Sequence, residues 1–112
     1  MSGQQTQERI VQALRHVVLF AFKAGVSVAE VDEVVARFAA LSRQPLGIET
    51  FEWGVNNSPE RLNFGHSHCF TLTFASEAAR DAYLSHPTHV AFAQWVGAFV
   101  EKALVVDYWA RA

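Results

Sequence analysis

Charged residues and cysteine are both scarce in this chain of 112 residues. Only 18% of the residues are charged, below the roughly 25% usual for soluble domains, and the nine lysines and arginines are scattered. Because nucleic-acid binding depends on clusters of such residues, we expect no nucleic-acid partner. The single cysteine, Cys69, excludes an internal disulfide and cysteine-rich metal motifs.

Long apolar runs are missing as well. No stretch approaches the ~20 residues that a membrane-spanning helix needs, and the first residues lack the basic and apolar regions of a signal peptide. We therefore expect a cytoplasmic protein without a membrane partner. Apolar side chains are nevertheless plentiful, since 51% of the residues are hydrophobic and 12% are aromatic. A chain of this length supports one domain, and its low charge leaves apolar surface for another molecule to cover.

Hydrophobic periodicity predicts four strands and two helical regions. We expect a flexible N-terminal tail over residues 1–14, in which residues 8–14 could form a helical turn, and one domain over residues 15–110. The predicted strands are 16–23, 48–55, 66–75 and 103–110. A helix is predicted from 28 to about 44, and a second helical region has segments 76–83 and 89–102 on either side of the break at His86-Pro87. The order β-α-β-β-α-β is typical of the α+β, ferredoxin-like fold with an antiparallel sheet.

The first predicted strand is apolar on both faces. Val18 and Phe20 face one way, whereas Val17 and Leu19 face the other. A sheet with one face in water should alternate apolar with polar residues, and the helices of this fold cover only one face. We therefore expect the second face to pack against the same face of a second copy, which gives a homodimer.

Histidine is the polar residue type that points most clearly to a site. His16 opens the first strand and His68 nearly opens the third. We expect these two strands of the split βαβ pattern to be parallel neighbours, so that both imidazoles lie at the same end of the sheet. Tyr83 and His89 flank the helix break, and the second helical region packs over one sheet face. The sequence therefore predicts one cleft lined by His16, His68, Tyr83 and His89.

Three interpretations of this cluster stay open. Polar residues at strand starts and helix breaks can simply satisfy backbone groups; His66 is interpreted as a strand-edge residue and His86 as part of the helix break. Alternatively, histidine titrates near neutrality and a tyrosine can orient it or polarise a carbonyl, which suits acid–base chemistry. Imidazoles can also bind Zn²⁺ or Fe²⁺, although this spacing matches no metal signature. Asp107 and Glu52 are interpreted as edge or surface charges.

Several segments together resemble the stress-responsive A/B barrel (Dabb) family over about residues 15–109. The most specific combination is a His-Pro-x-His segment with an aromatic residue three positions before it and a final Asp-Tyr. These segments are His-Val-Val-Leu-Phe-Ala-Phe-Lys, Phe-Glu-Trp-Gly-Val-Asn, His-Ser-His-Cys-Phe-Thr-Leu-Thr-Phe, Tyr-Leu-Ser-His-Pro-Thr-His-Val-Ala-Phe and Val-Val-Asp-Tyr. The resemblance implies a ferredoxin-like fold in a dimer whose two sheets close into an α/β barrel.

The resemblance also implies site residues. Most members have no assigned activity, but one plant member is a cofactor-free polyketide cyclase that promotes an intramolecular aldol condensation. By resemblance, its catalytic tyrosine and histidine fall on Tyr83 and His89, and two further pocket histidines fall on His16 and His68. A second pocket tyrosine falls on Phe38, which lacks the hydroxyl, so the same substrate is not implied.

The hypothesis that follows is a cofactor-free homodimer without a metal, which binds a small carbonyl or aromatic compound. His89 would be the base, Tyr83 would bind it or the developing enolate, and His16 and His68 would hold the polar end. The aromatic walls would come from Phe20, Phe38, Phe70, Phe74, Phe92 and Trp95. Two alternatives remain open: a non-catalytic, stress-associated structural dimer, and a relative of the monooxygenases that act on haem or aromatic substrates.

Overall fold

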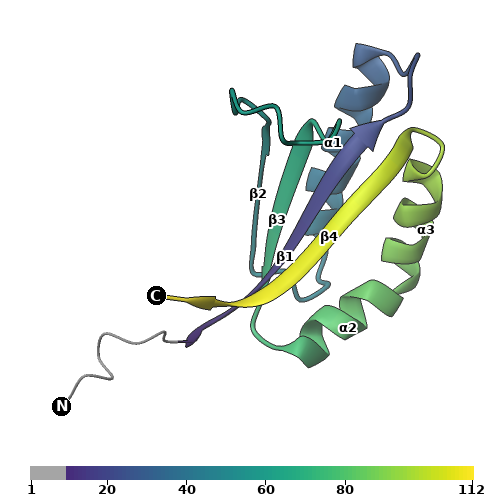
Figure 1. The fold of residues 1–112 in the computed structure, drawn as a ribbon. Helices are drawn as coiled ribbons and strands as arrows, with labels where there is room; N and C mark the ends of the chain where they lie inside the picture. Colours follow the sequence, from purple (N-terminus) through teal and green to yellow (C-terminus); the bar gives the residue numbers. More distant parts are fainter. Residues whose placement is uncertain (1–9) are drawn as a thin grey trace.

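The computed structural model describes residues 10–112, in which a four-stranded antiparallel sheet carries its helices on one face (Figure 1). The strand order is β2-β3-β1-β4, and the ferredoxin-like α+β prediction is confirmed. In chain order the elements are β1 (Ile10–Phe22), α1 (Val28–Ser42), β2 (Thr50–Val55), β3 (His68–Phe74), α2 (Glu77–Ser85), α3 (Pro87–Val96) and β4 (Val100–Arg111).

The start of α1 is fixed by the residues that the sequence pattern indicated. The Ser27 hydroxyl accepts a hydrogen bond from the Glu30 backbone N–H at 3.1 Å, and the Glu30 carboxylate accepts one from the Ser27 N–H at 2.9 Å. This reciprocal capping box satisfies two backbone donors that the first helical turn leaves free. Val34 and Phe38 then lie buried on the side of α1 that faces the sheet.

The second helical region breaks at His86, as predicted. His86 has extended backbone, and its ring Nδ1 accepts a hydrogen bond from the Thr88 N–H at 3.1 Å. Pro87 occupies the first turn of α3, where its missing N–H costs no hydrogen bond. α3 therefore begins at Pro87, two residues earlier than expected.

The prediction of a helix as far as residue 102 was wrong. α3 ends at Val96, and β4 begins at Val100 rather than at residue 103. Val100 pairs with Phe22, and Lys102 pairs with Ala21. Pairing with β1 therefore overrides the helical periodicity of this segment.

β1 is longer than the predicted strand because β4 continues beside it. Ile10 pairs with Arg111, and Leu14 pairs with Trp109. The flexible tail expected over residues 1–14 is therefore wrong for residues 10–14, as is the helical turn; residues 1–9 lie outside the described residues.

β1 and β3 run antiparallel, with Leu14 opposite Phe74 and Phe20 opposite His68. The expectation that they are parallel was wrong. β2 and β3 also pair antiparallel, so β1 and β2 point the same way and the strand between them runs against both. His16 and His68 consequently lie toward opposite ends of the sheet.

The two sheet faces differ in what covers them. Val18 and Phe20 are buried against the helices, as are Phe70, Leu72 and Phe74 of β3. On the open face, Val17 lies opposite Val106 and Leu19 opposite Leu104. Leu104, Val106 and Tyr108 are between 48% and 50% exposed.

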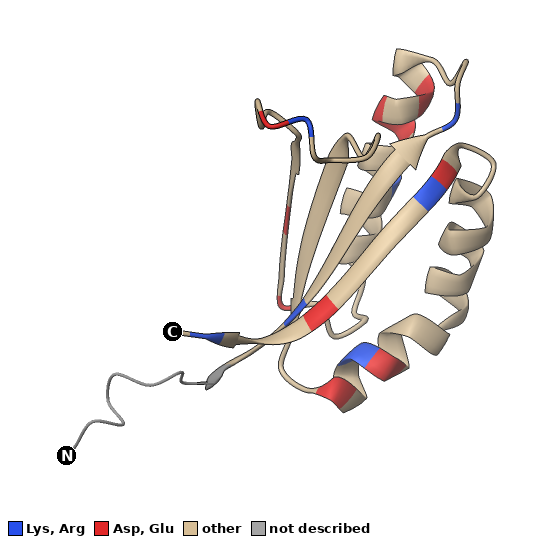
Figure 2. Ribbon diagram, in the orientation of Figure 1, with Lys and Arg blue, Asp and Glu red and all other residues tan. Residues whose placement is uncertain are grey.

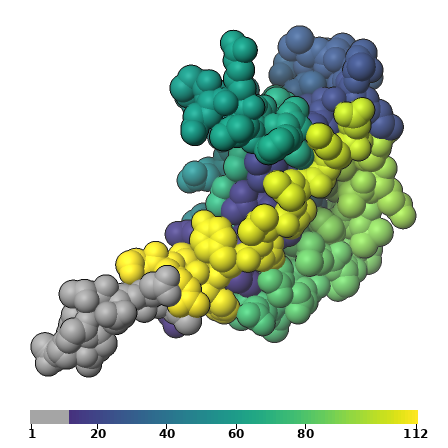
Figure 3. Space-filling view, viewed as in Figure 1, coloured from purple at the N-terminus to yellow at the C-terminus, as the bar shows by residue number. Residues whose placement is uncertain are grey.

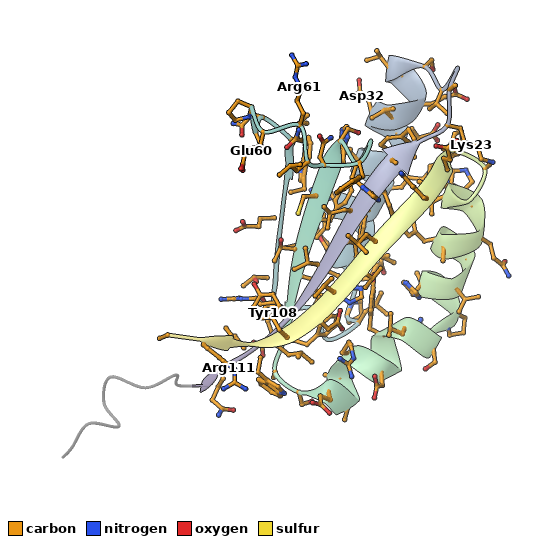
Figure 4. The ribbon with its side chains drawn as sticks, in the orientation of Figure 1. Lys23, Asp32, Glu60, Arg61, Tyr108 and Arg111 are labelled. Atoms are coloured by element: carbon orange, nitrogen blue, oxygen red, sulfur yellow. The ribbon has the colours of Figure 1, made fainter. Side chains whose placement is uncertain are left out.

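Most residues of the four strands are uncharged (Figure 2). The open face is turned toward the viewer in the space-filling view, where β4 runs beside β1 and the β2–β3 loop rises at one end (Figure 3). Figure 4 places Arg61 on that loop and Tyr108 near the opposite end of the sheet. Among the described residues, no helix is long and apolar enough to cross a membrane.

Candidate functional site

A cavity of about 800 Å³ lies between α2 and α3 on one side and the helix-covered face of β1 and β4 on the other. Its volume falls in the range of about 300–1,000 Å³ typical of small-molecule sites. Apolar side chains form most of the wall, and the polar groups gather at one end. The lining residues include His16, Val18, Phe20, Phe38, Arg80, Tyr83, His89, Phe92, Val96, Val100, Val105 and Asp107.

Three of the predicted site residues meet at the polar end. The Tyr83 ring centroid lies 6.2 Å from that of His16 and 4.5 Å from that of His89. β1 supplies His16, the end of α2 supplies Tyr83, and the first turn of α3 supplies His89. The break at His86 brings the last two together, because it redirects the chain between them.

The His89 ring is held in one tautomer. Its Nδ1 lies 2.9 Å from the Leu84 carbonyl oxygen; since a carbonyl can only accept, we assign the proton to Nδ1 and leave Nε2 as an acceptor. Burial lowers the pKa of His89, and the charge of His16 lowers it further, against the opposite effect of the Leu84 hydrogen bond. His89 is therefore neutral near pH 7 and competent as a base.

Tyr83 can act as a hydrogen-bond donor beside the base His89. The residue is almost completely buried, and this burial raises the pKa of its phenol. The hydroxyl therefore keeps its proton near neutral pH and can donate a hydrogen bond to an oxygen that gains negative charge.

An ion-paired chain supports the third member of the cluster. His16 Nδ1 lies 2.8 Å from Asp107 Oδ1, and Arg80 Nη1 lies 3.1 Å from Asp107 Oδ2. Asp107 lies on β4, an edge strand of the sheet, so the edge interpretation is confirmed, but it is not a surface charge. Antiparallel pairing places it directly opposite His16, and its side chain is only 19% exposed. Arg80 was not predicted as a site residue, although its position three residues before Tyr83 puts both side chains on one helix face.

The aromatic residues expected around the pocket divide into two groups. Phe20, Phe38 and Phe92 line the cavity. Phe70 does not: it is fully buried behind Phe38, at a centroid distance of 4.6 Å. Phe74 packs behind Tyr83, also fully buried.

Trp95 of α3 is half-buried and packs against the core from outside the cavity. The Arg37 guanidinium lies 4.2 Å from the centroid of its ring, and the two residues line a separate groove between α1 and α3.

His68 is not brought to this site. Its ring stacks on Trp53 at 6.0 Å and meets the edge of Phe22 at 5.2 Å. Its Nδ1 lies 2.8 Å from the Ser67 hydroxyl, and burial lowers the pKa of His68 against the attraction of Asp32. The predicted common cleft depended on parallel strands, and the antiparallel pairing separates the two imidazoles.

His66, the remaining histidine of this region, is buried just before β3. Its Nδ1 lies 2.8 Å from the Asn63 carbonyl oxygen, so its ring serves the β2–β3 loop. In the part of the chain that the structure describes, no three or more His, Cys, Asp or Glu side chains gather to hold a metal ion.

Residues 14–110 match the model of the stress responsive A/B barrel domain. The chain belongs to this family. Among curated members, HS1 of Arabidopsis thaliana, a stress-response A/B barrel domain-containing protein, is 38% identical over 95 residues, which cover 85% of this chain and 87% of HS1. Olivetolic acid cyclase of Cannabis sativa is 27% identical over 99 residues, which cover 88% of this chain and 98% of the cyclase.

Solved structures agree with this placement in the stress-responsive A/B barrel family. The hydroxynitrile lyase of Passiflora edulis superposes with a TM-score of 0.80 at 26% identity, over 86% of this chain and 91% of the lyase. A dimeric ferredoxin-like protein of unknown function from Jannaschia sp. CCS1 gives a TM-score of 0.73 at 28% identity, over 86% and 97% of the two chains. Since some of these relatives are named for different activities and another is described as of unknown function, the fold does not assign a reaction.

Proposed function

We propose that this stress-responsive A/B barrel protein binds a small carbonyl or aromatic compound and transfers a proton next to its carbonyl group, without a cofactor. The observation that carries the proposal is the His89–Tyr83 pair. A base with its Nδ1 fixed to Leu84 lies 4.5 Å, between ring centroids, from a buried phenol at the polar end of an apolar cavity.

The proposed step uses only these side chains. His89 Nε2 takes the proton from the carbon beside the carbonyl, the C–H electron pair moves into the new C=C bond, and the carbonyl oxygen becomes an enolate. The Tyr83 hydroxyl donates a hydrogen bond to that oxygen. A donor of this kind in a largely apolar cavity is worth about 3–4 kcal/mol in the transition state. The enolate then regains a proton, or its carbon attacks a second carbonyl.

The names of two relatives support an enzymatic function but not one particular substrate. Two of them are named as an olivetolic acid cyclase and a hydroxynitrile lyase. Phe38 places an aromatic ring without a hydroxyl in the wall of this cavity. We therefore propose a ligand whose middle part is apolar and whose oxygen atoms meet Tyr83 and His89.

The test is hydrogen–deuterium exchange at the α-carbon of β-keto esters and aryl ketones, followed by NMR in D₂O. We expect exchange with the wild type and a loss of about 10²–10⁴-fold in His89→Gln. Tyr83→Phe should also be slower, whereas Tyr108→Phe, which removes the hydroxyl of a tyrosine on the open face, should match the wild type. Equal exchange rates in the wild type and His89→Gln would contradict the proposal.

We further propose that the open sheet face binds a second copy, so that two sheets close into a barrel. Exposed Leu104, Val106 and Tyr108 form an apolar surface on β4, and solved relatives are described as dimeric. Val106→Lys should convert a dimer to a monomer in light-scattering measurements. Val28→Lys is the matched control, because Val28 is 78% exposed on α1, away from this face. An unchanged mass for Val106→Lys would refute this interface.

A further inference from the structure

We propose that Arg80 is a positioning residue that, through Asp107, fixes the ring orientation and the tautomer with which His16 meets a ligand, while His89 acts as the base. This inference rests on the proposed function, since it adds a second imidazole contact to the ligand of the same site. It concerns side chains from three elements, Arg80 on α2, Asp107 on β4 and His16 on β1.

The carboxylate of Asp107 is bound from both sides. Its Oδ1 accepts from His16 Nδ1 at 2.8 Å, and its Oδ2 accepts from Arg80 Nη1 at 3.1 Å. Both the Arg80 and the Asp107 side chains are 19% exposed, and that of His16 is 6% exposed. With one donor on each oxygen, the carboxylate has little freedom to rotate away from the imidazole.

This arrangement fixes which nitrogen of His16 the ligand meets. An ionised carboxylate only accepts, so Nδ1 carries the proton, and Nε2 is left for a ligand in the cavity that His16 lines. In this tautomer Nε2 is an acceptor and can take a hydrogen bond from a hydroxyl group of the ligand. Both imidazoles therefore offer Nε2 to the cavity, but His16 is oriented by an ion-paired carboxylate and His89 by a backbone carbonyl.

The other groups that face His16 do not supply this bias. Tyr83 of α2 presents a phenol that keeps its proton, and His89 of α3 presents a neutral imidazole. From β3 come Leu72, its strand partner, and the edge of the Phe74 ring at 6.3 Å. Asp107 is therefore the group that orients His16, and Arg80 is the group that orients Asp107.

A second carboxylate provides the matched control. Arg80 Nε also donates to Asp81 Oδ1 at 2.9 Å, but the Asp81 side chain is 66% exposed. An exposed ion pair of this kind contributes little to stability. If Arg80 served only as a surface ion pair, loss of either carboxylate partner would have similarly small effects on the His16 tautomer and on the exchange rate. The proposal instead predicts a large effect for loss of Asp107 and none for loss of Asp81.

The test reads the ring nitrogens of His16 directly. The ¹⁵N chemical shifts of the imidazole report which nitrogen holds the proton, and His16→Gln assigns the signals. We expect one Nδ1–H tautomer in the wild type and in Asp81→Asn, and mixed tautomers in Asp107→Leu and Arg80→Gln. Arg80→Lys keeps the cation and should restore part of the wild-type spectrum, which separates positioning from misfolding.

Turnover supplies the second readout. Arg80→Gln should slow α-carbon exchange about tenfold and Asp107→Leu about 100-fold, chiefly in kcat rather than KM. If Arg80→Gln has the same His16 tautomer and the same exchange rate as the wild type, the role of Arg80 is refuted and the proposed function is not affected. If the wild type shows no exchange but its His16 tautomer still changes in Arg80→Gln, only the proposed function is refuted, because the tautomer measurement needs no turnover.

Discussion

His16 and His68 lie on the same helix-covered sheet face, on neighbouring strands, yet their surroundings have almost nothing in common. His68 is opposite Phe20, four residues along β1 from His16, which is roughly 13 Å at about 3.3 Å per residue. His16 bonds a carboxylate and opens onto the cavity. His68 is enclosed by Trp53, Phe22 and Phe70. The partners around an imidazole, rather than the residue type, therefore decide what it can do.

Phe70 marks the boundary between the two regions. Its ring stacks on Phe38 on the cavity side, at 4.6 Å, and on Trp53 and His68 on the other side, at 6.3 and 6.4 Å. It is fully buried. The aromatic cluster at the His68 end thus forms the rigid wall against which the cavity residue Phe38 rests.

The largest expected effect comes from removing this boundary. Phe70→Ala should lower the free energy of unfolding by about 3–5 kcal/mol, the usual cost of deleting a buried phenylalanine ring. Phe92→Ala removes a ring that is half-buried and lines the cavity, so it should cost less stability. Urea unfolding followed by circular dichroism measures both. Equal losses in the two variants would mean that the boundary between the two regions does not exist.

The second effect concerns ligand binding and is measured by isothermal titration with the ketone that the wild type exchanges fastest. His16→Gln should weaken binding about tenfold, because it removes a hydrogen bond to a charged or polar group worth about 1.5 kcal/mol. His68→Gln changes an imidazole outside the cavity and should leave affinity within about twofold, since no contact with the ligand is lost. Equal weakening by the two substitutions would show that both histidines serve one site.

The sequence was sufficient for the fold wherever local signals agreed. The Ser27–Glu30 capping box, the break at His86 and the apolar strands each predicted an element that the structure contains. Where two signals competed, as in the segment from Gly97 to Lys102, helical periodicity gave the wrong boundary. Strand pairing decided the outcome there, and pairing depends on residues far away in the chain.

The site was predictable only in part for the same reason. Tyr83 and His89 are close in sequence, so their meeting at the helix break follows from local structure. The approach of Asp107 to His16 requires the register of β4 on β1, and the position of His68 requires the direction of β3. Whether Phe38 or Phe70 lines the cavity depends on how α1 sits on the sheet, which no spacing in the sequence fixes.

The smallest expected effect concerns the pH dependence of stability, to which a histidine in each of the two regions contributes. Burial lowers the pKa of both His68 and His89 from the ordinary value of 6.5. Well above pH 6.5 both the folded and the unfolded protein leave these rings unprotonated, so they contribute no pH dependence there. As the pH falls below 6.5, the unfolded chain binds protons that the folded chain resists, and the folded state loses stability.

Replacing either imidazole should therefore weaken the dependence of the unfolding free energy on pH. The loss of unfolding free energy between about pH 7.5 and about pH 5, measured in urea, should be smaller in His68→Gln and in His89→Gln than in the wild type, and smallest in the double variant. Because the two rings share no direct contact, the two reductions should add. If the two reductions do not add, the two regions are coupled through the rings between them, Phe70 and Phe38, and do not behave independently.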